Sequence, residues 1–246
     1  MTNDKVYIHE FINIIGHNRA RYMHHMTANW CPVAREERNQ LCFGVWATVG
    51  STGEWPEVVN LWELDGWDGL VANFEHEFAG GATQDPSLAQ WWAAAADLRR
   101  GGSDRIVVPA PWSPTIDEHC RAGLRGEAYA HEVISMGPGA AGDYLDVVGA
   151  RGIDAYGDFG LSLVGAFATA MRSEGEVILV WAIPTWAAWA EFEQASLRRD
   201  GLIGLKHAVR EFGAHTQRTL LVDAALAPLR TGRQPQIGDR RPLSEI

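Results

Sequence analysis

The chain has 246 residues, 46% of them hydrophobic, and a net charge of -10, which suits one large or two small globular domains with a sizeable core. The acidic balance and the lack of any Lys/Arg cluster argue against nucleic acid as a partner. The first residues lack the features of a signal peptide, and the longest apolar run (177–190) is too short to cross a bilayer, so the sequence predicts a cytoplasmic protein with no membrane partner.

The first half of the chain predicts alternating strands and helices. In chain order, the expected elements are a strand over 6–13, a helix over 19–35, strands over 41–49 and 58–64, a helix after Asp65, a helix over 87–99 and a short strand over 106–109. In the first helix, apolar and amide side chains recur on one face at helical spacing, namely Tyr22, Met26, Asn29 and Val33.

The second half repeats this order. Its expected elements are a strand over 128–135, a helix over 140–156, strands over 161–171 and 177–183, a helix after Thr185, a helix over 202–212 and a strand over 219–222. Identical residues recur at an offset of 122, which shrinks to 119 only where loops would lose residues; the pairs include Tyr7 and Tyr129, His9 and His131, Glu10 and Glu132, Tyr22 and Tyr144, and Trp62 and Trp181. The chain is therefore an internal duplication.

The duplication predicts an α+β fold made of two ferredoxin-like repeats, over residues 1–122 and 123–227. Each repeat has helices on one face of an antiparallel sheet, and the bare face needs a cover. We expect the two sheets to face each other and form a barrel with the helices outside. Residues 228–246, rich in Arg and Pro, predict an extended tail that reaches a neighbouring molecule, and a homodimer is one assembly that the sequence allows.

Short motifs in the first half resemble a known family. Phe11 with Gly16 five residues later, the segment Val-Val-Asn-Leu-Trp-Glu-Leu over 58–64, and Trp67 at the start of the next helix resemble a NIPSNAP domain. The resemblance extends over residues 6–227 and implies the dimeric α+β barrel superfamily. That superfamily also holds cofactor-free monooxygenases, lactone isomerases, dehydratases and haem enzymes such as chlorite dismutase, so the fold alone does not settle the activity.

The duplication also supplies an internal control for site residues. A position that is polar in one copy and apolar in the other is not required by the fold; three such positions are His25 against Val147, Asn60 against Leu179, and Glu63 against Ala182. By period-two alternation, Asn60 and Trp62 share one sheet face and Glu63 points to the other. We therefore expect a site between the first helix and the sheet of the first copy.

These residue types point to acid–base chemistry. A neutral imidazole beside an amide and a phenol can move a proton near neutral pH and hold a developing oxyanion. The expected catalytic residues are His25, Tyr22, Asn60, Glu63 and His9, and the expected substrate-binding residues are Trp46, Trp62, Met26, Asn29 and Trp67. Because His9 and Glu10 recur in the second copy, a structural role, with the glutamate paired to an arginine, is the alternative for them.

No nucleotide, phosphate or metal motif is present, and the three cysteines include no C-x-x-C pair. The sequence therefore predicts an enzyme without metal or organic cofactor, a lyase, dehydratase or isomerase, whose partner is an apolar, aromatic small-molecule substrate. The alternatives are a cofactor-free monooxygenase, a haem enzyme with His207 or His215 as the ligand, which the resemblance to chlorite dismutase implies, and a non-catalytic NIPSNAP-like binding protein.

Overall fold

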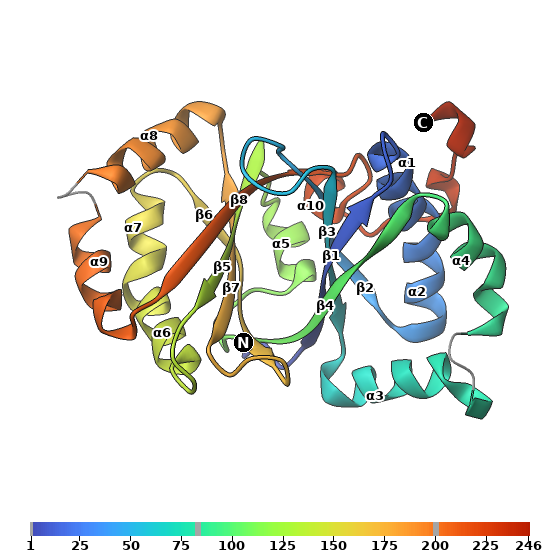
Figure 1. Cartoon of the computed structure of the whole chain (residues 1–246), viewed down its shortest axis with the longest axis horizontal. Coiled ribbons are helices and arrows are strands. Elements are labelled where there is room, and N and C mark those ends of the chain that lie inside the picture. Colours follow the sequence, from blue (N-terminus) through green and yellow to red (C-terminus); the bar gives the residue numbers. More distant parts are fainter. Residues whose placement is uncertain (1, 82–84, 199–201) are drawn as a thin grey trace.

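Eight antiparallel strands close into a barrel in the computed structural model, which describes residues 2–81, 85–198 and 202–246 (Figure 1). The first repeat contributes β1 (Val6–Ile14), β2 (Leu41–Thr48), β3 (Glu57–Leu64) and β4 (Arg99–Pro109). The second contributes β5 (Ala128–Ser135), β6 (Ser162–Ala170), β7 (Glu176–Ile183) and β8 (His215–Asp223).

The strand order within each repeat is ferredoxin-like. Around the barrel the strands run β4-β1-β3-β2 and then β8-β5-β7-β6, and the two repeats join where β2 pairs with β8 and β4 pairs with β6. Every strand is thus hydrogen-bonded on both sides, which removes the exposed edges that invite aggregation. The predicted α+β barrel of two fused repeats is confirmed.

The helices pack outside the barrel, those of the first repeat on one side and those of the second on the other (Figure 1). The first repeat has α1 (Arg19–His24), a π-helical turn η1 (His25–Trp30), α2 (Cys31–Arg38), α3 (Gly66–Glu77), the 3-10 turn η3 (Pro86–Leu88) and α4 (Ala89–Ala96). The second has α6 (Ala141–Val147), the π-helical turn η4 (Val148–Gly152), α7 (Ile153–Gly157), α8 (Trp186–Leu197), α9 (Ile203–Val209) and the 3-10 turn η5 (Arg210–Phe212). These positions match the helices expected from the sequence.

Aromatic side chains fill the barrel at one end. Tyr7, Phe43 and Phe167 pack edge to face there, with ring centroids 4.8 to 6.2 Å apart. The short helices α5 (Ile116–Ala122) and α10 (Pro228–Thr231) pack against this core. Helix α5 was not predicted; it begins with a capping box between Thr115 and Glu118, the sequence signature of a helix start.

A glycine permits the same irregularity in both repeats. The register of β2 shifts between Cys42 and Gly44, and that of β6 shifts at the matching Gly165. A Cβ atom on Gly44 would lie 1.9 Å from the ring of Trp46, and one on Gly165 would lie 2.4 Å from the ring of Phe167. The aromatic rings of the barrel core therefore need glycine two residues earlier on the same strand.

The last strand of each repeat begins earlier than the sequence predicts: β8 begins at His215 rather than at residue 219, and β4 shows the larger change. The helix expected to reach Arg99 ends at Ala96, and β4 begins at Arg99 rather than at residue 106. Gly102 makes the longer strand possible, because a Cβ atom there would lie 2.0 Å from the carbonyl oxygen of Phe11 on β1. The extension moves Arg99 from a helix to the sheet, where it becomes part of the site described below.

The carboxy-terminal tail packs on the first repeat of its own chain (Figure 1). Gln234 exchanges two hydrogen bonds with the backbone of Cys42, at 3.0 and 2.8 Å. Arg240 donates to the carbonyl of Ala28, and Arg241 pairs through its backbone with His24. The tail therefore covers the helices of the first repeat.

Replacing Gly44 by alanine is expected to destabilise the protein by about 1 to 3 kcal/mol, because the fully buried Trp46 ring cannot move away. Gly142→Ala on α6 is the matched control, since a Cβ atom there meets nothing within 4 Å and alanine favours a helix by up to about 1 kcal/mol. Urea unfolding of the two variants measures the difference. Equal stability of the two would contradict the packing described here.

Candidate functional site

The predicted site residues divide between the two faces of the barrel sheet. Asn60 and Trp62 on β3 face the helices, whereas Glu63 faces the interior, as alternation predicted. Glu63 accepts hydrogen bonds from the hydroxyl of Tyr7 and from the backbone nitrogen of Ile116 at the start of α5. It therefore anchors α5 and does not meet Asn60.

Three other predicted residues also lie away from the helix side of β3. Trp46 is inside the barrel, 5.8 Å from the ring of Tyr129, because the glycine-dependent irregularity of β2 turns it inward. Trp67, in the first turn of α3, is 50% exposed. His9 points into the barrel. The structure corrects the expectation that these side chains would share a site with Asn60.

His9 and His131 form a pair at the centre of the barrel. Their Nε2 atoms are 2.8 Å apart, and the rings are nearly parallel. Burial, together with the neighbouring His131 and Arg105, holds the pKa of His9 well below its ordinary value, and burial lowers that of His131 to about 3. Both rings are neutral near pH 7, so one donates its proton to the other across the boundary between the repeats.

The first repeat contains a cavity of about 150 Å³ between the sheet and its helices, called here the repeat 1 cleft. Its floor is the outer face of β1, β3 and β4, and its walls come from η1, α2, α3 and α4. Its lining residues are Ile8, Glu10, Met26, Trp30, Arg38, Gln40, Trp62, Asn73, Phe74, Glu77, Phe78, Trp91, Trp92 and Arg99. Six of these are aromatic, so the cleft presents ring faces around a small number of charged groups.

Glu10 supplies a carboxylate to this cleft. It lies opposite Asn60 in the strand register, and its Oε2 accepts hydrogen bonds from Asn60 Nδ2 and Trp62 Nε1, each at 2.8 Å. Both donors contact Oε2, and no donor among the described residues contacts Oε1. Burial and the carboxylate of Asp104 raise the pKa of Glu10, which the two donors and Arg99 partly offset. A carboxyl group whose pKa is raised holds its proton more readily and is a stronger base when ionised, so it can both accept and release a proton.

Asn60 positions the Glu10 carboxylate, and Tyr22 in turn positions Asn60. Asn60 Nδ2 also donates to the hydroxyl of Tyr22, at 3.0 Å. Neither residue is among those lining the cavity, and both are fully buried. We therefore assign them a positioning role, because their contacts fix the orientation of the carboxylate without reaching the cavity.

His25 is buried as predicted but does not line the cleft. Its Nδ1 contacts the Asn29 side-chain amide at 3.1 Å, and its ring stacks on Trp91 at 5.0 Å. Burial lowers the pKa of His25. Met26, one residue later, does reach the cavity. The structure thus places His25 and Asn29 behind the wall that Trp91 forms, and not against a substrate.

Unpaired polar atoms cluster at the repeat 1 cleft. Nine buried side-chain polar atoms in the described part of the chain lack a protein partner, and five of them belong to residues in or against this cleft: Arg38 Nε, Trp91 Nε1, Trp92 Nε1, His25 Nε2 and Asn60 Oδ1. The other four belong to the barrel interior. An unpaired buried polar group lowers the stability of the fold by roughly 1 to 3 kcal/mol. The concentration of such groups at the repeat 1 cleft therefore requires an explanation other than folding.

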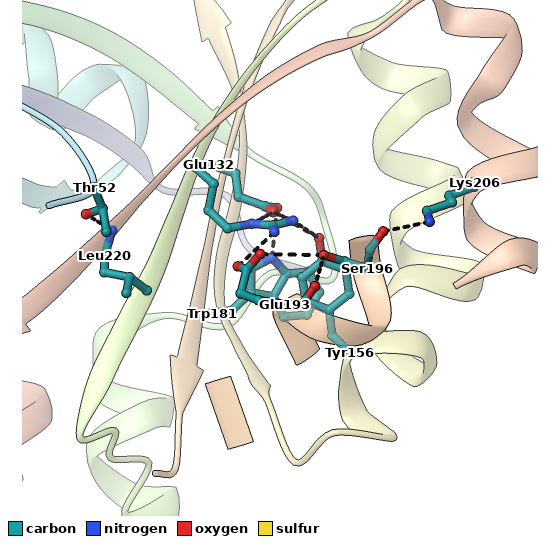
Figure 2. A network of polar contacts seen from close by, with 9 residues as sticks. Thr52, Glu132, Tyr156, Trp181, Glu193, Ser196, Lys206 and Leu220 are labelled. Carbon is teal, nitrogen blue, oxygen red and sulfur yellow. Dashed lines mark hydrogen bonds and ion pairs between the residues drawn. The ribbon is translucent and has the colours of Figure 1, made fainter. Parts of the chain in front are cut away.

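The matching layer of the second repeat is fully paired. Glu132, the counterpart of Glu10, accepts hydrogen bonds from Tyr156 and Trp181 (Figure 2) and forms an ion pair with Arg218. Arg218 also contacts Glu193, at 3.0 Å. The carboxylate of this repeat is therefore neutralised by its own chain.

One substitution explains why only the first repeat is open above its tryptophan. Tyr156 stacks on Trp181 with ring centroids 4.1 Å apart. Tyr156 is the fourth residue of α7, and the fourth residue of α2 is Ala34. The exchange of tyrosine for alanine leaves room over Trp62, where the cavity lies.

The second repeat does not fit a haem bound through a helical histidine. His207 is exposed on α9, His215 is exposed at the start of β8, and the space over Trp181 is filled by Tyr156. In the part of the chain that the structure describes, no group of three or more His, Cys, Asp or Glu side chains could hold a metal ion. No described helix has the length and apolar character needed to cross a membrane.

Sequence reasoning missed Glu10, Arg99 and the tryptophan pair of α4 as site residues. Glu10 was given a structural role because the second repeat also has a glutamate there. The signal that could have found it is the pairing of strands 6–13 and 58–64, which places Glu10 beside Asn60 on the same face. Arg99 was assigned to a helix, so its position in the sheet could not be foreseen.

The fold and the duplication define this chain as a tandem dimeric α+β barrel protein. Its sequence matches no protein-family model and no curated protein, so the resemblance to NIPSNAP domains stays a prediction. Solved structures of low identity share the fold. One is an anthrone oxidase-like protein (TM-score 0.57, 10% identity, covering 92% of this chain and 96% of that one).

Two further structures are similar in the same way. A protein assigned as a monooxygenase from Lactobacillus acidophilus NCFM has a TM-score of 0.56 and 6% identity, and the match covers 90% of this chain and 97% of that one. A protein assigned as a chlorite dismutase has a TM-score of 0.52 and 11% identity, with 94% and 98% covered. At such identities the likeness establishes the fold and leaves the activity to the site.

The two glutamates are expected to respond differently to neutralisation. Glu132→Gln removes the more buried of the two carboxylates that pair with Arg218 and should destabilise the protein by roughly 2 kcal/mol, because only the Glu193 ion pair then remains. Glu10→Gln should cost about 1 kcal/mol or less, since Asn60 and Trp62 are neutral donors that the amide oxygen can still accept from. Urea unfolding at neutral pH compares the two; a larger loss for Glu10→Gln would refute the difference between the repeats.

Proposed function

We propose that the protein is an enzyme that binds a small aromatic molecule in the repeat 1 cleft and moves a proton on it through Glu10. The observation that supports this most is the difference between the repeats. The same layer that is filled by Tyr156 and neutralised by Arg218 in the second repeat is open in the first, where a carboxylate faces a cavity. The fold does not require this opening, because the second repeat folds without it.

The size and lining of the cleft indicate the class of ligand. A cavity of about 150 Å³ with apolar walls is large enough to bind benzene, whereas sites for drug-sized ligands have about 300 to 1,000 Å³. The repeat 1 cleft has about 150 Å³ and six aromatic lining residues. It therefore suits one aromatic ring, or the reacting end of a larger molecule that extends to the surface.

The charged and polar groups support proton transfer on that ring. The Glu10 carboxylate can take a proton from an acidic carbon or hydroxyl group of the substrate. The Arg99 guanidinium, which lies over the Trp92 ring at 5.4 Å, and the unpaired Trp91 and Trp92 N–H groups can stabilise the anion that forms. Return of the proton to a second atom completes an isomerisation, and loss of a leaving group completes a lyase or dehydratase reaction.

A cofactor-free monooxygenase is the second candidate. Two proteins with this fold are described as a monooxygenase and as anthrone oxidase-like. The same first step, in which Glu10 deprotonates a phenol, would give an electron-rich anion that itself reduces dioxygen. The substrate then supplies the electrons, and the chain's residues bind the ring, remove the proton and exclude water from the anion.

Turnover of an aromatic substrate is expected to fall by about 100-fold or more in Glu10→Gln, because the proton-transfer group is lost. A panel of phenols and aryl ketones in deuterated water, followed by NMR, detects proton exchange, and an oxygen electrode separates the redox-neutral reaction from oxygenation. Glu132→Gln is the matched control in the second repeat and should keep its turnover once its folded fraction is accounted for. Full activity of Glu10→Gln would refute the proposal, and binding without any turnover would indicate a binding protein.

Asn60→Leu gives the first repeat the residue that the second has, and it is expected to shift the acidic limb of the kcat/KM profile to higher pH. The reason is that the hydrogen bond from Asn60 lowers the pKa of Glu10, and a base must be deprotonated to act. Asn13→Ala, which removes an amide from the inner face of β1, should leave the limb in place. A lower rate with an unshifted limb would show that Asn60 acts in another way.

A further inference from the structure

A second cavity, of about 610 Å³, lies at the open end of the barrel, on the face of the sheet opposite the repeat 1 cleft. Phe11, His131 and Val133 line it from inside the barrel, and Glu57 and Thr52 line it from the rim. Thr52, in the loop between β2 and β3, accepts a hydrogen bond from the backbone nitrogen of Leu220 on β8, which ties the loop to the barrel (Figure 2). The volume is within the range of small-molecule sites.

The open end of the barrel that holds this cavity is called the barrel mouth. Each repeat contributes a matching threonine and glutamate to it. In the first repeat, Thr48 donates to Glu57 Oε1 at 3.3 Å; in the second, Thr169 donates to Glu176 Oε1 at 2.9 Å. Both pairs join the last residues of one strand to the first residue of the next. The two halves of the mouth can therefore be compared residue by residue.

The second half of the mouth contains a cation supplied by the chain. Arg105 on β4 donates to Glu176 at 2.8 Å, and its guanidinium lies 5.2 Å from the centre of the Phe11 ring. The side chains of Arg105 and Glu176 are 11% and 13% exposed. A guanidinium between a carboxylate and an aromatic ring is a favourable arrangement for a desolvated cation.

The first half lacks that cation. Arg105 lies opposite His9 in the strand register, and the residue opposite His131 is Thr219. Glu57 is 8% exposed, it lines the cavity, and no cation of the described residues forms an ion pair with it. A carboxylate with the same threonine partner as Glu176 thus faces open space where its counterpart faces a guanidinium.

We propose that the barrel mouth binds a small organic cation, with an ammonium or guanidinium group on Glu57 and an apolar body against Phe11 and Val133. The ligand takes the place that the Arg105 side chain takes in the other half. Hydroxyl and amide groups of Ser103, Gln217 and Thr219 line the same space and can accept the remaining N–H groups of the cation. The proposal is independent of the proposed function, because the two cavities lie on opposite faces of the sheet.

The charges around Glu57 set the direction of the pH dependence. Burial and the nearby Glu54 raise the pKa of Glu57 to about 7. His131 at the cavity is kept neutral by burial, and Arg218 is paired with Glu132 on the outer face. Arg105, over the Phe11 ring, is paired with Glu176, and Arg19 donates to the carbonyl of Thr48 nearby. A cation should therefore bind more tightly above neutral pH, where Glu57 is ionised, than below it.

The test uses benzylamine as the probe and benzyl alcohol as its uncharged analogue, with binding to the whole protein followed by calorimetry at about pH 8. Benzylamine is expected to bind at least about tenfold more tightly than the alcohol, and about tenfold more weakly at pH 6 than at pH 8. Glu57→Gln should remove this preference. The preference should persist in Glu10→Gln, which lacks the carboxylate that benzylamine could meet in the aromatic cleft, and this separates the barrel mouth from that cleft.

Thr219→Arg is the second variant, because it supplies the first half with the guanidinium that the second half already has. It should abolish benzylamine binding while the protein remains folded by circular dichroism. Equal binding of benzylamine and benzyl alcohol, unchanged benzylamine binding in Glu57→Gln, or the absence of saturable binding at up to about 10 mM benzylamine would overturn the proposal. So would displacement of benzylamine by potassium ions at comparable concentration, which would indicate a site for inorganic cations.

Discussion

The pairing of β2 with β8 and of β4 with β6 is the constraint on which the whole molecule depends. A four-stranded ferredoxin-like sheet has two free edges, which invite pairing with other chains, and one uncovered face, which needs a cover where it is apolar. Joining two such sheets edge to edge removes both problems in one step. The closure also fixes which side chains point inward, so every strand presents one row of residues to the barrel and another to the helices. The repeat 1 cleft and the cavity in the barrel follow from that division, because Glu10 on β1 lines the first and its neighbour Phe11 lines the second.

The two repeats show how a site can arise within a duplicated fold. Glu10 and Glu132 occupy the same place on their strands, and each accepts a hydrogen bond from the tryptophan that follows on the next strand. What differs is the surrounding layer: Arg218 and Tyr156 pair with Glu132 and cover Trp181 in the second repeat, and no residue that the structure describes does the same in the first. The second repeat therefore contributes stability through a paired network, and the first can keep polar groups unpaired. Because the barrel joins the two repeats into one folding unit, the stability of the second repeat can offset the cost of the unpaired polar groups in the first.

Much of the fold could be predicted from the sequence, and the site only in part. The offset of the repeats and the alternation along 58–64 placed the strands, the long helices and the opposite directions of Asn60 and Glu63 correctly. The barrel mouth, the role of Glu10 and the place of Arg99 could not be found in this way, because each depends on a neighbour far away in the chain. A residue shared by both repeats looked structural, although its partner on β4 or β8 decides whether it is neutralised. His25 was placed correctly inside the helix layer, but periodicity cannot distinguish a wall from the residue behind it.

The pair formed by His9 and His131 has a consequence of its own for the symmetry of the protein. Two neutral imidazoles that share one hydrogen bond cannot be equivalent, since one must donate and the other must accept. The halves of the barrel would differ at this point even if their sequences were identical. Protonation of both rings would leave two Nε2–H donors facing each other at the junction of the repeats. The unfolded chain takes up protons on these histidines below about pH 6.5. Acidification should thus destabilise the protein at the contact between its two repeats, where His9 meets His131.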